Sequence, residues 1–308
     1  MPHDHHGHTH LSAESGDRRV AIAIWANGLL TVAQVAGGFF AGSLALIADA
    51  LHNLSDMMAL VIAFAARKIA RRPADGQMTF GYKRIEIVAA LINYTTLIVV
   101  GLYLIYEGGM RLIDPPEVMG WIVVIIAGVA LVIDTLTALL TWSMQKGSQN
   151  IRALFVHNLT DALASVAVII GGTLIILYNL YWIDAAITIG IAAYILYLAL
   201  TEISRPVRLL MLASPPGLDG AAVVAAIRQV AGVDDLHHVH LWEMQENEPA
   251  LEAHIVIAPG SHAGAEGVKA AIRARLLQEF GITHTTLEFE LPGTCPQTVT
   301  LFGHGSHG

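Results

Sequence analysis

The sequence predicts an α-helical membrane protein with six transmembrane helices, followed by a cytoplasmic α+β domain. The 308 residues are 55% hydrophobic and 14% charged, with a mean hydropathy of +0.58, which is too apolar for an ordinary soluble domain. Six segments provide the ~20 apolar helical residues that a bilayer core requires. From about Arg205 onward this pattern stops, and polar alternation with charged helices follows.

The apolar segments define the membrane domain, residues 18–204. The six predicted spans are 20–42, 44–66, 86–107, 118–142, 154–178 and 182–202. Residues 1–17 form a polar, histidine-rich tail that cannot build a core. Because no short apolar run with a small-residue cleavage site follows the polar start, we expect no secretory signal and a retained first span.

Basic residues predict the orientation of the spans, since cytoplasmic loops are enriched in Lys and Arg. Only Arg111 lies on the far side. The others fall at the opposite ends: Arg18, Arg19, Arg67, Lys68, Arg71, Arg72, Lys83, Arg84, Lys146, Arg152, Arg205 and Arg208. We therefore expect a multi-pass protein with both termini in the cytoplasm. The net charge of -8 argues against a nucleic-acid partner, and the single cysteine, Cys295, is compatible with a reducing compartment.

The α+β domain is predicted for residues 205–293, with a tail at 294–308. Spaced aliphatic residues indicate helices at 219–231 and 264–279. Alternating residues indicate strands at 236–244, 250–257 and 282–290. Both helices are expected on one face of the sheet.

Two nearly identical motifs interrupt apolar spans, HNLSD at residues 52–56 and HNLTD at 157–161. Residues i and i+4 share one helix face, so His52 pairs with Asp56 and His157 pairs with Asp161. An ionised carboxylate at bilayer depth costs at least ~2.5–3.5 kcal/mol, and a divalent cation would compensate that cost. A single histidine is more simply a buried residue bonded to a carbonyl, but two identical pairs favour a metal site.

Two imidazoles and two carboxylates suit tetrahedral Zn²⁺. Fe²⁺, Co²⁺, Ni²⁺ and Cd²⁺ stay open, because affinity order alone does not set selectivity. Asp49 lies on the same face as Asp56 but is not expected among the ligands. Protons would compete with the metal, since histidine binds it only when neutral and both aspartates must be ionised.

Other polar residues near the spans have different expectations. Asp134, in the fourth span, should face the bundle or a wet cavity and is a candidate for proton transfer. Asp184 is expected at the membrane interface. Glu107 and Arg111 are spaced i, i+4, which predicts an ion pair on the outer side.

Longer motifs extend over nearly the whole chain. They are LALIADALHNLSD, RRPADGQMTFGYKRIEI, YEGGMRLIDPP, the second HxxxD, HVHLWEM, LEAHIVI and ITHTTLEFELPGTC. With these motifs the chain resembles the cation diffusion facilitator family, in particular its zinc-transporting members.

The resemblance implies a homodimer that exchanges cytoplasmic Zn²⁺ for protons across the lipid bilayer, with His52, Asp56, His157 and Asp161 as ligands of the transported ion. It also implies that the cytoplasmic domain has a metallochaperone-like (ferredoxin-like) fold and binds further zinc. By motif match the ligands there are His240, His254, His284 and Glu290. Weaker candidates are His237, His238 and His262, and, for loose capture of metal by the tail, His3, His5, His6, His8 and His10.

Two other function classes stay open at this point. One is a metal-responsive membrane receptor whose intramembrane site acts on the soluble domain. The other is an intramembrane zinc metalloenzyme, which we do not favour, because catalytic zinc keeps an open coordination position and no H-E-x-x-H motif is present. We therefore expect a secondary active transporter and no enzyme.

Overall fold

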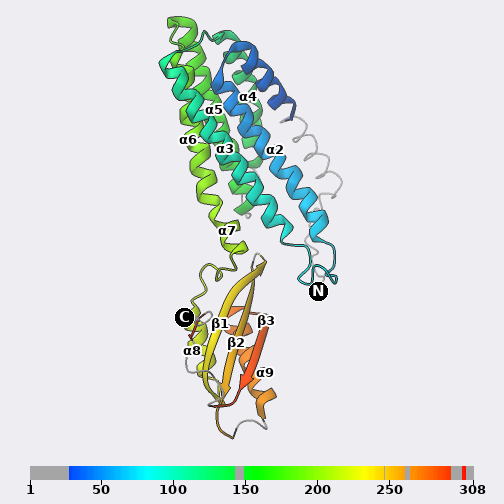
Figure 1. The fold of residues 1–308 in the computed structure, drawn as a ribbon. Coiled ribbons are helices and arrows are strands. Elements are labelled where there is room, and N and C mark those ends of the chain that lie inside the picture. The colour runs from blue at the N-terminus through cyan, green and yellow to red at the C-terminus, as the bar shows by residue number, and fades with distance from the viewer. Residues whose placement is uncertain (1–27, 143–148, 246, 261–263, 293–299, 303–308) are drawn as a thin grey trace, which may run out of the picture. The chain divides into compact units, whose positions relative to one another are not determined.

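The computed structural model describes residues 28–142, 149–245, 247–260, 264–292 and 300–302 (Figure 1). The chain divides into two compact units. One comprises the chain up to Ala65 together with Ile92–Ile203, and the other comprises Ala66–Leu91 together with the chain from Ser204 onward.

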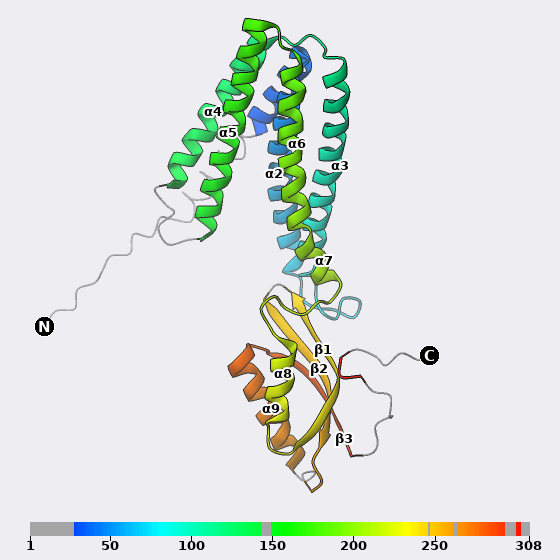
Figure 2. The same ribbon diagram turned by 90° about the vertical axis from the view of Figure 1, so that its left-hand side faces the viewer.

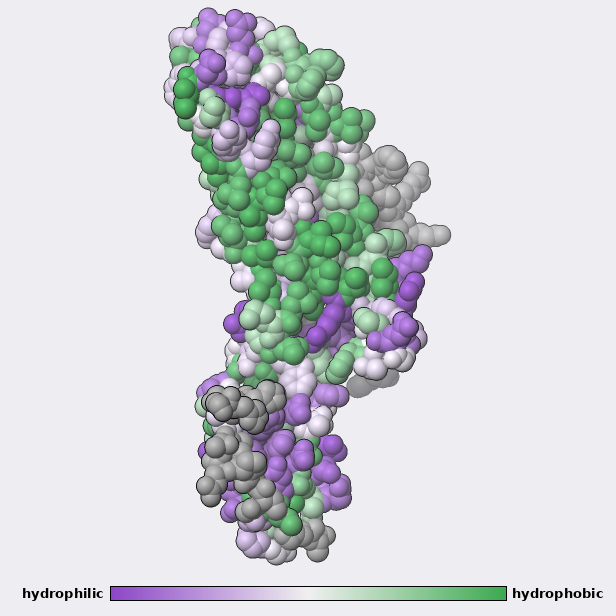
Figure 3. All heavy atoms as spheres, viewed as in Figure 1, coloured by the Kyte–Doolittle hydropathy of each residue, from purple (hydrophilic) through white to green (hydrophobic). Residues whose placement is uncertain are grey.

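Five helices in the described part are long and apolar enough to cross a membrane. They are α2 (Leu44–Ala70), α3 (Ile85–Ile113), α4 (Gly120–Trp142), α5 (Gln149–Tyr178) and α6 (Trp182–Glu202). Apolar residues cover much of the outer surface of these helices (Figure 3). The first predicted span begins before the described residues, and its described part is a shorter apolar helix, Gly28–Ala41. The multi-span helical prediction is confirmed, and the sixth span stays a prediction.

A carboxylate from another helix caps the start of α2. Asp184, in the first turn of α6, accepts hydrogen bonds from the Ser43 hydroxyl and from the backbone N–H of Leu44, the latter at 2.7 Å. Asp184 is only 4% exposed, and its expected place at the membrane interface, which concerns depth in the bilayer, stays a prediction. The acid is buried because it satisfies N–H groups that the first helical turn leaves without intrahelical partners.

The turn before α2 is fixed from a second direction. Gly42 has a φ of +72°, which glycine adopts without steric cost. Its carbonyl accepts a hydrogen bond from Arg111 Nη1 at 2.8 Å, and Arg111 Nε donates to Glu107 at 3.0 Å. The predicted Glu107–Arg111 pair is confirmed, and the arginine also joins α3 to the start of α2.

The C-terminal part is a three-stranded sheet with two helices. Its elements are α7 (Ser204–Leu210), α8 (Gly220–Arg228), β1 (Val233–Gln245), β2 (Glu248–Ile257), α9 (Ala265–Phe280) and β3 (His284–Glu290). The strand order is β1-β2-β3, with β1 antiparallel and β3 parallel to β2. Helices α8 and α9 cover one face (Figure 2), as predicted, and the core includes Leu236, Leu251, Ile255, Ile272 and Leu276.

The other face of the sheet is open among the described residues and carries polar side chains. Leu251, Ala253 and Ile255 of β2 belong to the core. Because side chains alternate along a strand, Glu252 and His254 point to the open face. This face holds the histidines considered below.

We expect Asp184→Ala to lower the stability of the membrane helices. The substitution leaves the Ser43 hydroxyl and the first amides of α2 buried without their acceptor, which costs about 1–3 kcal/mol for an unsatisfied buried group. Thermal unfolding of the full chain in detergent should show a lower midpoint. Asp114→Ala, at an exposed position after α3, is the control, and equal midpoints for the two variants would contradict the capping role.

Candidate metal centres

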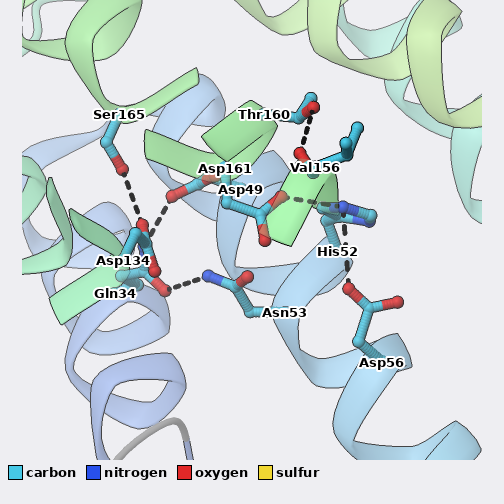
Figure 4. A network of polar contacts seen from close by, with 10 residues as sticks. All are labelled: Gln34, Asp49, His52, Asn53, Asp56, Asp134, Val156, Thr160, Asp161 and Ser165. Atoms are coloured by element: carbon cyan, nitrogen blue, oxygen red, sulfur yellow. Dashed lines mark hydrogen bonds and ion pairs between the residues drawn. The ribbon is translucent and has the colours of Figure 1, made fainter. Parts of the chain in front are cut away.

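Helix α2 aligns three titratable side chains, Asp49, His52 and Asp56, as Figure 4 shows. His52 Nε2 lies 3.6 Å from Asp56 Oδ2, one turn further along the helix. The exposed fraction is 12% for the His52 side chain and 35% for Asp56. The pairing predicted from the i, i+4 spacing is therefore present.

Helix α5 brings a second carboxylate to the same imidazole. Asp161 Oδ1 lies 3.4 Å from His52 Nε2, and the Asp161 side chain is 8% exposed. His52 thus stands between Asp56 of its own helix and Asp161 of α5 (Figure 4). His157 lies on α5 one turn before Asp161, but its side chain is outside the described part, so its role as fourth ligand stays a prediction.

These donors fit a divalent cation, although they do not enclose one. A tetrahedral zinc ion with bonds of ~2.0–2.2 Å holds neighbouring ligand atoms about 3.3–3.5 Å apart, close to both distances from His52. The three residues do not form a group in which every ligand atom lies within 4.8 Å of the others.

A cavity of about 350 Å³ reaches this cluster. Its lining includes Asp49, His52 and Asp161, together with residues of α5 and α6 such as Ala164 and Tyr194. The cluster is therefore accessible through the helix bundle, as a site that exchanges its ligand requires.

A network of amides supports the cluster. Gln34, which is fully buried, donates to Asp49 through Nε2 and accepts from Asn53 Nδ2 at 3.1 Å. Asp49 is thus engaged by an amide, in line with its expected place outside the ligand set. Gln34 and Asn53 were not predicted from the sequence. Their presence in apolar helices indicates such a network, because a buried amide needs hydrogen-bond partners.

Asp134 lies on α4 and is buried, with 7% of its surface exposed. Ser165 of α5 donates to Asp134 Oδ2 at 3.4 Å. The expectation that Asp134 faces the bundle is confirmed, and its candidate role in proton transfer stays a prediction.

A second cluster lies on the open face of the C-terminal sheet. His254 Nδ1 is 2.6 Å from Glu290 Oε1, and His237 Nε2 is 3.4 Å from Glu290 Oε2. The ligand atoms of His237, His254 and Glu290 all lie within 4.8 Å of one another. Strands β1, β2 and β3 each contribute one residue, so the folded sheet creates a three-ligand group that fits zinc.

The structure brings together two of the four ligands expected in this domain. His254 and Glu290 meet, and His237, a weaker candidate, joins them. His240 instead lies beside His238, with the two Nε2 atoms 3.3 Å apart. His284 is exposed at the start of β3, opposite Ala250, whereas Glu290 is at the strand's other end. His262 and the tail histidines His3, His5, His6, His8 and His10 lie outside the described residues.

The connection between α2 and α3 is ordered by one carboxylate. The Tyr82 hydroxyl, at 2.6 Å, and the backbone N–H groups of Met78 and Gln77 donate to Asp75 and hold the pKa of that carboxyl below its usual value. Three donors to one side chain close the loop into a single conformation.

Two basic residues join this connection to the hairpin between β1 and β2. Lys83 Nζ lies 2.9 Å from Glu248 Oε1, and Arg84 Nε donates to the Met244 carbonyl at 2.9 Å. The loop that follows α2 therefore contacts the sheet that carries the second cluster.

Fold and clusters together define a multi-pass membrane protein with clusters of histidine and carboxylate side chains among its helices and on a C-terminal α+β domain. Models of the cation efflux transmembrane domain and of the cation efflux protein cytoplasmic domain match residues 20–211 and 215–291. The chain belongs to the cation efflux family, the cation diffusion facilitators, and its C-terminal domain is the cytoplasmic domain of that family. The resemblance inferred from the motifs is confirmed.

Three relatives illustrate the relationship. The metal cation efflux system protein CzcD of Cupriavidus metallidurans is 34% identical over 92% of this chain and 90% of its own. The cadmium, cobalt and zinc/H(+)-K(+) antiporter of Bacillus subtilis is 32% identical over 92% of both chains. The zinc transporter ZitB of Escherichia coli is 31% identical over 100% of this chain and 99% of its own. The protein is accordingly a transporter and no enzyme, as predicted.

Proposed function

We propose that the protein exports divalent transition-metal cations from the cytoplasm, Zn²⁺ first, in exchange for protons. The observation that carries this proposal is the position of His52 between carboxylates of two different helices. A site shared by α2 and α5 changes its affinity when the helices move against each other. His157 completes the proposed ligand set of His52, Asp56, His157 and Asp161.

Proton exchange follows from the chemistry of these ligands. An imidazole accepts a metal only after losing its proton, and aspartate binds it as the carboxylate. Protonation on the acidic side of the membrane therefore weakens metal binding there and releases the ion, while neutral cytoplasm favours loading. The site would open to one side of the membrane at a time when the helices move around an unchanged ligand set.

The proposed architecture extends the described one to the whole chain. It has six spans, with residues 18–204 as the membrane domain and 205–293 as a ferredoxin-like cytoplasmic domain, flanked by tails at 1–17 and 294–308. Both termini are cytoplasmic, in accord with the placement of Lys and Arg, and the membrane is the bacterial inner membrane. The protein acts as a homodimer, which the match to the family's cytoplasmic-domain model supports.

The cytoplasmic domain is proposed to bind zinc through His237, His254 and Glu290. His284 lies at the other end of β3. It is therefore proposed as a ligand only of a separate ion or of an ion shared with a partner subunit. The tail histidines are proposed as a weak, fast-exchanging capture site, because the tail's composition gives them no fixed geometry.

Loss of one membrane ligand should abolish zinc flux. His52→Ala and Asp161→Asn each remove one donor of the proposed ligand set, so the loss should exceed the ~10–100-fold effect of removing a supporting outer-shell partner. Zinc uptake by proteoliposomes is the measurement, and Asp114→Asn is the matched exposed control. If both variants kept zinc-dependent proton exchange, the site assignment would be wrong.

A pH gradient should drive zinc flux in the direction opposite to proton flow. Vesicles with an acidic lumen should accumulate zinc while the lumen becomes more alkaline, and apparent affinity should rise with external pH as the ligands lose protons. A lumenal pH dye and a zinc dye record both flows, with Cd²⁺, Co²⁺, Ni²⁺ and Fe²⁺ compared in turn. Zinc accumulation without proton movement would refute the exchange.

Glu290→Gln should remove zinc from the cytoplasmic cluster without affecting the fold. The substitution keeps the shape but takes away the charged oxygens that contact both His237 and His254. In the full chain with Asp161→Asn, bound zinc per chain at equilibrium should fall by one equivalent. Glu279→Gln, on α9 and paired with Arg275, is the control, and unchanged zinc in Glu290→Gln would contradict the assignment.

A further inference from the structure

A buried amide joins the first described helix to α2. Gln34 lies in the apolar helix Gly28–Ala41 and is fully buried. Its Nε2 donates to Asp49 Oδ2, and its Oε1 accepts from Asn53 Nδ2 at 3.1 Å. Figure 4 shows this amide beside the titratable cluster of α2. Gln34 therefore uses both ends of its side chain on the helix that carries His52.

The orientation of the Gln34 amide follows from its two partners. A carboxylate only accepts hydrogen bonds, and the amide nitrogen of Asn53 only donates them. Gln34 accordingly turns its NH2 group to Asp49 and its carbonyl oxygen to Asn53. These partners are spaced i, i+4, so they lie one above the other on α2. One side chain from a neighbouring helix thus holds a full turn of α2.

The turn held by Gln34 contains a proposed ligand of the transported ion. His52 lies three residues after Asp49, and residues at i and i+3 are neighbours on a helix surface, with Cβ atoms ~5–6 Å apart. Asp49 also lines the cavity that reaches His52 and Asp161. Rotation of the Asp49 side chain away from Gln34 would therefore bring a third carboxylate toward an ion bound at His52.

A third carboxylate would change the metal preference of the site. The proposed set of two imidazoles and two carboxylates suits tetrahedral Zn²⁺. With Asp49 added, the set has five ligands and more oxygen than nitrogen, and oxygen-rich sites of higher coordination suit Mn²⁺. The hydrogen bond from Gln34 opposes this change, because rotation of Asp49 would leave a buried amide donor without its acceptor.

We propose that Gln34 is a positioning residue that determines metal specificity. It holds the Asp49 carboxylate outside the ligand set and so favours Zn²⁺ over Mn²⁺. Gln34 acts through Asp49 and makes no contact with the ion itself. This inference rests on the proposed function and deepens it, because it names the residue that keeps the transport site four-coordinate.

The first test measures Zn²⁺ and Mn²⁺ flux in proteoliposomes under the same pH gradient. Gln34→Met keeps the length of the side chain but removes both hydrogen bonds. The ratio of zinc flux to manganese flux should fall by ~10–100-fold, the usual effect of losing a supporting partner. Thr188→Val is the control, because it removes another buried hydrogen bond, to the Asp184 carbonyl, and should leave the ratio unchanged.

Rescue separates control of specificity from simple support of the fold. Adding Asp49→Asn to Gln34→Met removes the released carboxylate, so the ratio should return to that of the unmodified chain. An unchanged ratio in Gln34→Met, or a low ratio that persists in the double variant, would overturn the proposal.

A shorter amide guards against misfolding of Gln34→Met. Gln34→Asn keeps a buried amide but is one methylene too short to bridge Asp49 and Asn53. It should lower the ratio of zinc flux to manganese flux in the same direction, and rescue by Asp49→Asn should again follow. A ratio equal to that of the unmodified chain in a folded Gln34→Asn variant would contradict the proposal.

Co²⁺ reports the ligand number directly, because four-coordinate Co²⁺ absorbs visible light strongly and five- or six-coordinate Co²⁺ absorbs it weakly. The spectrum of each variant in detergent, minus that of the same variant with His52→Ala, isolates the membrane site. The band should be strong in the unmodified chain, weak in Gln34→Met and strong again with Asp49→Asn added. A strong band in Gln34→Met would reject this inference alone, whereas zinc flux that survives His52→Ala would reject the proposed function beneath it.

Discussion

The cost of burying a carboxylate among apolar helices organises the membrane part of this protein. Each buried acid needs a compensating partner, and the partners differ. Asp184 accepts from the start of α2, Asp49 accepts from Gln34, and Asp161 lies against the imidazole of His52. In the proposed function, the acids bonded to amides serve the fold, whereas an acid that lies against a histidine serves the cation. The type of partner then separates the structural acids from the proposed ligands.

Much of the fold could be predicted because hydropathy and strand alternation act locally. Residue patterns alone predict the spans, the order of elements in the C-terminal domain and the position of both helices on one face of the sheet. The i, i+4 pairing of His52 with Asp56 follows from helix geometry in the same way. The amide support of Gln34 and the cap by Asp184 could not be predicted, since each joins helices whose relative rotation no local pattern specifies.

The cytoplasmic ligands show a sharper limit of sequence reasoning. The match to family motifs selected His240 with His254, and regular alternation along β1 would place His237 and His240 on opposite faces. A β-bulge between His237 and His240 changes this alternation, and the N–H groups at His238 and Val239 donate to the carbonyls of Thr300 and Leu301, some sixty residues further along the chain. A contact between such distant segments produces no periodic pattern in the sequence around the bulge.

The proposed ligand set of four protein side chains would constrain how the ion can leave. Catalytic zinc sites retain an open position, whereas fully protein-ligated sites are closed, so an incoming molecule cannot displace the metal by simple ligand exchange. Release must then come from protonation of the ligands or from separation of the helices that carry them. Because protonation removes the attraction that draws the two carboxylates toward the ion, the two routes would reinforce each other in the proposed exchange of metal for protons.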